Sequence, residues 1–140
     1  RSSDLKLKRP YVRYTRADEK NVRKADCLIV DCFGLLSSIY RYGEIAYIGG
    51  GFGVGIHNTL EAAVYGIPVI FGPKYQKFQE AVQLLEAKGA FSVKDYEELK
   101  TLLDRMLTDE VFLRESGMNA SNYVTGNAGA TDKIMSMINF

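Results

Sequence analysis

The chain has 140 residues, of which 46% are hydrophobic and 25% are charged, and its formal net charge at pH 7 is +1. This length and composition predict a single globular domain, residues 1–140, with enough apolar residues for a core. The near-neutral charge gives no overall attraction to nucleic acid, and no apolar run reaches the roughly 18 residues that a membrane-spanning helix needs.

The charge is unevenly distributed along the chain. Residues 1–24 hold nine Lys or Arg and three Asp or Glu, a net charge of +6. We favour a solvated basic strand and helix face, with residues 1–10 flexible, over docking on an anionic membrane surface. Cys27 and Cys32 are five residues apart and lie on opposite faces of a predicted strand, so no disulfide is expected between them. With a single histidine, no multi-histidine metal site is expected either.

Short apolar runs alternate with amphipathic stretches along the chain. Such alternation predicts βαβ units: an α/β, Rossmann-like parallel sheet of about five strands with helices on both faces. In chain order, we expect strands at 11–15, 27–30, 45–48, 68–71 and 90–93, and helical segments at 18–25, 35–42, 57–65, 76–88, 95–107, 109–123 and 130–138.

The stretch from residue 45 to residue 61 organises the rest of the chain. Four apolar residues predict a strand covered on both faces, and five of the next seven residues are glycine. A glycine loop before a helix start favours phosphate, because backbone N–H groups and the helix dipole face the ligand. The same loop also suits close helix packing alone, and it fits neither a Gly-x-Gly-x-x-Gly frame nor a P-loop. The glycines that we expect at the ligand are Gly50, Gly51, Gly53 and Gly55.

Polar side chains follow the glycine loop. His57, Asn58 and Thr59 offer donors to a ligand, although Asn58 or Thr59 also suits a helix N-cap. Glu61 suits a ribose diol because a carboxylate only accepts hydrogen bonds, and it equally suits the first turn of the helix. Lys77, with Lys74, would neutralise a phosphate or a sugar carboxylate, although solvated lysines are more common.

Three loops meet at the carboxyl edge of the predicted sheet, where ligands bind in such folds. They are residues 31–36, 49–58 and 72–77, and all are rich in glycine or polar residues. No pair of residues forms a convincing catalytic set, because there is one histidine and no nucleophile elbow. The sequence therefore predicts the nucleotide-holding half of an enzyme.

Four segments together resemble one family. They are residues 28–36 (Leu-Ile-Val-Asp-Cys-Phe-Gly-Leu-Leu), 49–51 (Gly-Gly-Gly), 55–63 (Gly-Ile-His-Asn-Thr-Leu-Glu-Ala-Ala) and 66–73 (Gly-Ile-Pro-Val-Ile-Phe-Gly-Pro). This combination resembles the C-terminal domain of the 3-deoxy-D-manno-octulosonic acid (Kdo) transferases, over roughly residues 27–107. The resemblance departs from the family at Leu35, where Glu is usual, at Gly51, where many members have Ser, and at Lys77, where some have Asn.

The resemblance implies the C-terminal half of a GT-B glycosyltransferase, which binds the donor CMP-Kdo and transfers Kdo with inversion to the lipid A precursor. It implies no metal or other cofactor, and it places the general base and the acceptor site in an N-terminal domain. It also implies a location at the cytoplasmic face of the bacterial inner membrane. By this analogy Gly34 and Leu36 line the nucleotide pocket, the loop 51–55 with His57 and Asn58 faces the phosphate and cytidine, and Glu61 holds the ribose.

Two other functions remain open from the residues alone. One is another GT-B enzyme such as a UDP-sugar epimerase, although the acid/base carboxylates that it needs are not evident. The other is a nucleotide-binding module without catalysis.

Overall fold

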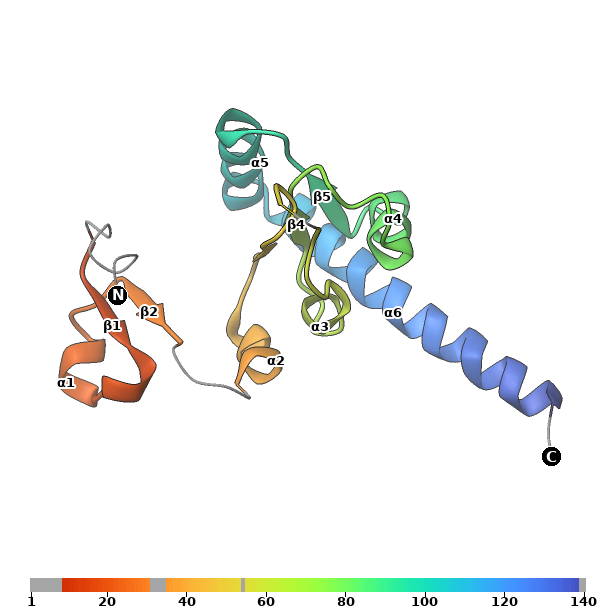
Figure 1. Cartoon of the computed structure of the whole chain (residues 1–140), viewed down its shortest axis with the longest axis horizontal. Helices are drawn as coiled ribbons and strands as arrows, with labels where there is room; N and C mark the ends of the chain where they lie inside the picture. The colour runs from red at the N-terminus through yellow and green to blue at the C-terminus, as the bar shows by residue number, and fades with distance from the viewer. Residues whose placement is uncertain (1–8, 31–34, 54, 139–140) are drawn as a thin grey trace. The chain divides into compact units, whose positions relative to one another are not determined.

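The computed structural model describes residues 9–30, 35–53 and 55–138. The chain divides into two compact units, Arg1–Ile39 and Tyr40–Phe140, and most of their helices and strands are labelled in Figure 1. Most of the predicted flexible segment, residues 1–10, lies outside the described residues, as do Asp31, Cys32 and Gly34. The single domain expected from the chain length stays a prediction.

The first unit contains one two-stranded parallel sheet. Strands β1 and β2 pair with Tyr11 opposite Cys27. The apolar run at 27–30 also predicts a buried strand, and this burial is wrong, because Leu28 is 46% exposed. The three residues of β2 pair with one equally short strand, which leaves little apolar surface to cover them. The elements are β1 (Tyr11–Arg13), a 3-10 turn η2 (Tyr14–Arg16), α1 (Glu19–Val22), β2 (Cys27–Ile29) and α2 (Leu36–Ile39).

Helix α1 begins where the sequence predicts. The Asp18 side chain accepts a hydrogen bond from the Asn21 amide at 2.8 Å, and the Asn21 side chain accepts one from the Asp18 amide at 2.8 Å. This reciprocal capping box satisfies two amides that the first turn of a helix leaves without partners.

The second unit contains a three-stranded parallel sheet in the order β3-β4-β5, flanked by helices. The α/β fold class is therefore confirmed, and all five predicted strands are present. Two of them pair in a sheet of the first unit, and three pair in a sheet of the second. The elements are a 3-10 turn η3 (Tyr40–Tyr42), β3 (Ala46–Ile48), α3 (Leu60–Ala63), β4 (Val69–Phe71), α4 (Gln79–Glu86), β5 (Ala90–Ser92), α5 (Tyr96–Thr108) and α6 (Glu110–Ile138).

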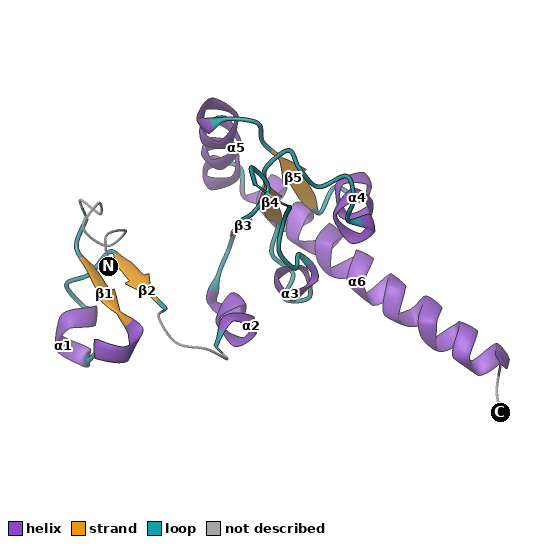
Figure 2. Ribbon diagram, in the orientation of Figure 1, coloured by secondary structure: helices purple, strands orange, loops and turns teal. Residues whose placement is uncertain are grey.

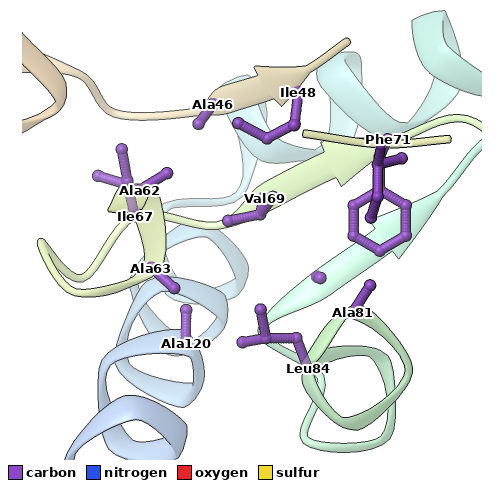
Figure 3. Packing of buried hydrophobic residues seen from close by; sticks show 12 residues of the cluster. Ala46, Ile48, Ala62, Ala63, Ile67, Val69, Phe71, Ala81, Leu84 and Ala120 are labelled. Atoms are coloured by element: carbon purple, nitrogen blue, oxygen red, sulfur yellow. The ribbon is translucent and has the colours of Figure 1, made fainter. Parts of the chain in front are cut away.

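Strand β4 is the centre of the second unit, with its three residues fully buried. Val69 and Phe71 pack on one face against small residues of three helices (Figure 3), namely Ala62, Ala63, Ala81 and Ala120. Ile70 faces the other way and packs with Met106 of α5 and Val93. Alternate side chains of a strand serve opposite faces, so one short strand joins two apolar clusters.

Two predictions about this unit are wrong. Tyr47 is 48% exposed although β3 was expected to be covered on both faces. Tyr47 pairs with Ile70, but the residues packed around Ile70 come from other elements and do not include Tyr47. The two helices predicted at 109–123 and 130–138 form the single helix α6, which Figure 2 shows as one continuous ribbon. Gly126 and Gly129 cost helix stability, but unlike proline they keep the backbone N–H groups that continue it.

Candidate functional site

The glycine loop, residues 49–55, is folded on its own backbone. The amides of Gly53 and Gly55 both donate to the Gly50 carbonyl at 3.1 Å, and the His57 amide donates to the Gly49 carbonyl at 3.1 Å. Gly50 has a φ of 94°, in the region that favours glycine. These three amides stabilise the loop itself, so an anion at this loop would need other donors.

Gly51 brings the glycine loop against the loop that follows β4. A Cβ at Gly51 would lie 2.4 Å from the Gly72 nitrogen, so only glycine allows this contact. The Lys74 amide also donates to the Gly51 carbonyl at 2.8 Å. The predicted meeting of the loops 49–58 and 72–77 is therefore confirmed. In the loop 31–36, Gly34 lies outside the described residues and Leu36 is the first residue of α2.

The helix after the glycine loop is shorter than predicted. Helix α3 begins at Leu60 rather than at His57 and has four residues. The Asn58 side chain accepts a hydrogen bond from the Leu60 amide at 2.9 Å, which makes Asn58 the capping group that the sequence allowed. Thr59 stands at the N-cap position but makes no capping hydrogen bond with its side chain. A single turn aligns few peptide dipoles, so its attraction for an anion is weaker than that of the predicted helix.

Two hollows lie beside these loops and share the ring of Phe78. The Thr59 hollow has a volume of about 260 Å³ and is lined by Ile56, His57, Asn58, Thr59, Leu60, Phe78 and Glu80. The lysine hollow has a volume of about 290 Å³ and is lined by Gly53, Lys74, Gln76, Lys77 and Phe78. Phe78 lies against Gly55, where a Cβ would meet the ring at 2.8 Å.

The two hollows differ in charge. Lys74 and Lys77 line the lysine hollow, and no carboxylate is among its lining residues. Glu80 supplies a carboxylate to the Thr59 hollow. Opposite charges on neighbouring hollows would orient a ligand that has an anionic part and a neutral part.

Glu61 lines neither hollow. Burial raises the pKa of the Tyr40 hydroxyl, and the charge of Glu61 raises that pKa further, which places Glu61 near Tyr40. The alternative of a ribose contact for Glu61 stays a prediction, as do the ligand roles of Gly50, Gly51, Gly53, Gly55, His57, Asn58, Thr59 and Lys77.

Within the described residues, no group of three or more His, Cys, Asp or Glu side chains is arranged to hold a metal ion. In the same part of the chain, no helix has both the length and the apolar character to cross a membrane.

The sequence of the chain is similar to those of known transferases. No protein-family model matches the chain. It is 44% identical over 87 residues, 61% of its length, to the 3-deoxy-D-manno-octulosonic acid transferase of Aquifex aeolicus. It is 33% identical over 116 residues, 81% of its length, to the transferase of the same name from Rickettsia bellii. The chain is a relative of the Kdo transferases. It covers 25% of the Aquifex protein and 28% of the Rickettsia protein, about a quarter of the length of each.

A solved structure shares the fold of this Kdo transferase relative. It is the C-terminal CMP-Kdo binding domain of WaaA from Acinetobacter baumannii, with a TM-score of 0.65 and 20% sequence identity. The match covers 82% of this chain and 63% of that one. The predicted Rossmann-like α/β fold is therefore confirmed, and the chain shares it with this C-terminal domain.

Sequence reasoning missed the places of Phe78 and Glu80 in the hollows. Phe78 lies within the helix predicted at 76–88, but it precedes α4 as its N-cap residue and is 37% exposed. Glu80 was not singled out. Phe78 fits the helical period with Ala81 and Val82, so the hydrophobic pattern carries no signal that its ring separates two hollows.

Proposed function

We propose that this chain is the donor-binding domain of a Kdo transferase, a glycosyltransferase that binds CMP-Kdo and transfers Kdo with inversion to the lipid A precursor. The observation that carries this proposal is the 44% identity over 87 residues to the Aquifex transferase. The shared fold with a CMP-Kdo binding domain supports it.

The lysine hollow suits the charge of such a donor. A nucleotide-linked sugar acid is anionic, and the two lysines of a hollow that no carboxylate lines would attract it. We assign Lys77 and Lys74 to the anionic part, and the neighbouring glycine loop, His57 and Asn58 to the same donor. The proposed nucleotide contacts of Gly34 and Leu36 and the ribose contact of Glu61 follow from the family resemblance.

In this proposal the chain contributes no catalytic residue and needs no metal. The general base and the lipid acceptor site belong to an N-terminal domain, and the enzyme works at the cytoplasmic face of the inner membrane. The basic residues near the start of the chain would favour an anionic membrane. Neutralising Lys6, Lys8, Arg9 and Arg13 should then weaken sedimentation of the protein with anionic vesicles, and unchanged sedimentation would count against membrane docking.

Calorimetric titration of the full chain tests donor binding. We expect CMP to bind more tightly than UMP or phosphate. Glu61→Ala should weaken CMP binding about tenfold, the loss of a hydrogen bond to a charged group. Glu86→Ala is the matched control, because Glu86 is an exposed carboxylate on α4 that lines neither hollow.

Each alternative gives a different titration. A preference for UMP would favour an enzyme of UDP-sugars, and no binding of any nucleotide at millimolar concentration would contradict the proposed function. If Glu61→Ala and Glu86→Ala changed CMP binding equally, the ribose contact of Glu61 would be contradicted and the proposed function would stand.

A further inference from the structure

We propose that the Thr59 hollow is a sugar-hydroxyl subsite in which Thr59 and Glu80 select the transferred sugar. This inference rests on the proposed function, because it divides the bound donor between the two hollows. The lysine hollow takes the anionic part, and the Thr59 hollow takes hydroxyl groups of the sugar.

The first observation is the Thr59 hydroxyl. Thr59 is 4% exposed and lines the hollow. Its backbone carbonyl accepts from the Ala63 amide, but no described residue makes a hydrogen bond with its side chain. By contrast Ser116, the other buried hydroxyl of the described core, donates to the Phe112 carbonyl at 2.7 Å. Buried polar groups are nearly always paired, so an unpaired hydroxyl in the wall of a hollow points to a ligand partner.

The second observation is Glu80. Its side chain is exposed, and it makes no ion pair or hydrogen bond with any residue in the described part of the chain. A carboxylate accepts hydrogen bonds and repels a phosphate or a second carboxylate. A sugar hydroxyl donates to such a group, whereas an anion is directed to Lys74 and Lys77 across the Phe78 ring.

The third observation is the chemistry in the relatives' name. A 3-deoxy-octulosonic acid has one carboxylate and several hydroxyls, so it presents both kinds of group within one molecule. The Thr59 hollow, at about 260 Å³, is smaller than the roughly 300–1,000 Å³ of pockets that enclose whole drug-sized ligands. Its size and polarity therefore suit one part of a nucleotide-linked sugar rather than all of it.

The test compares CMP with CMP-Kdo as ligands of the full chain. The measured quantity is the dissociation constant of CMP divided by that of CMP-Kdo, a ratio that isolates the contribution of the sugar. Thr59→Val loses one hydrogen bond to the sugar, and Glu80→Gln weakens one by removing the charge of its acceptor. Each should lower this ratio about five- to tenfold. Both should leave the CMP dissociation constant within about twofold of wild type, and the control Glu86→Gln should change neither value.

The outcomes separate this inference from the proposed function. Equal weakening of CMP and CMP-Kdo by Thr59→Val and Glu80→Gln would place both residues at the nucleotide and overturn the sugar subsite. An unchanged ratio in both variants would also overturn the sugar subsite. Binding of CMP in that experiment would still support the proposed function. Wild-type chain that binds neither ligand would overturn both. Glu80→Gln keeps the test valid if Thr59→Val fails to fold, because Glu80 is exposed.

Discussion

The two faces of strand β4 are packed by different means. On the face of Val69 and Phe71, alanines of three helices bring the helix backbones close to the sheet. On the face of Ile70, larger side chains such as Met106 and Leu102 fill the space below α5. The first face carries the elements that shape the two hollows, namely β3, α3 and α4 with their loops.

The difference shows where the fold cannot accept a larger side chain. A Cβ at Gly89 would lie 2.5 Å from the backbone of Ala120, so β5 and α6 meet with no room for a methyl group. Side chains such as methionine, in contrast, adjust by changing rotamer. We call the face of Val69 and Phe71 the small-residue face. We expect a larger side chain to destabilise the protein strongly on this face, and a substitution of similar volume to cost little on the face of Ile70.

The largest effect should come from Gly89→Ala. The added methyl group must displace the backbone of α6 rather than a flexible side chain, and we expect a loss of about 3 kcal/mol in the free energy of unfolding. Urea denaturation measures it. The control is Gly126→Ala, since nothing lies within 4 Å of a Cβ there. The control should stabilise α6 by up to about 1 kcal/mol. Equal effects of the two variants would contradict the contrast between the faces.

A smaller effect is expected from Met106→Leu on the other face. Met106 is 1% exposed and packs with Ile70 and Val93. A volume-conserving swap in such surroundings costs less than about 1.5 kcal/mol. Ala120→Val on the small-residue face should cost more, although both changes are modest in chemistry. A larger loss for Met106→Leu than for Ala120→Val, in the same urea experiment, would contradict the proposed contrast between the two faces.

The N-terminal cap of α5, the helix that covers the face of Ile70, should contribute about 1 kcal/mol to the free energy of unfolding. The Asp95 side chain accepts from the Glu98 amide at 2.9 Å, and the Glu98 side chain accepts from the Lys94 amide at 2.8 Å. Asp95→Ala removes the first of these bonds and should cost about 1 kcal/mol, whereas Asp95→Asn should retain most of the stability. Equal losses for both variants would show that the charge of Asp95, rather than its cap, is responsible.

Local signals in the sequence predicted the elements well but not their surroundings. Asp18 and Asp95 cap helices at the starts of the predicted segments 18–25 and 95–107, because capping depends on a few neighbouring residues. The exposure of Tyr47 was missed because it depends on how far the packing around Ile70 extends, which no local pattern records.

The candidate site was only partly predictable for the same reason. Glycine count and polar neighbours located the loop, and the two loops joined by Gly51 and Gly72 do meet. The sequence does not show that the loop amides bond to one another or that the Phe78 ring separates two hollows of different charge. These are tertiary contacts between residues far apart in the chain.

The smallest effect should appear only at alkaline pH, at the edge of the small-residue face where Tyr40 packs. Burial, and then the charge of Glu61, raise the pKa of Tyr40 above its ordinary value of 10.0. The folded state therefore holds this proton more tightly than the unfolded state. The resulting stability is complete below pH 10 and is lost as the pH rises through the folded-state pKa.

Tyr40→Phe removes this ionisable group, so its urea midpoint should fall less between pH 8 and pH 11 than that of the wild type. Tyr96→Phe is the control for loss of a hydroxyl, because Tyr96 is 68% exposed. Glu61→Ala should act in the same direction as Tyr40→Phe and more weakly, since burial is the larger cause of the shift. If Tyr40→Phe instead fell as steeply as the wild type, Tyr40 and Glu61 would not be coupled at this edge, and Glu61 would be left to its proposed ligand contact alone.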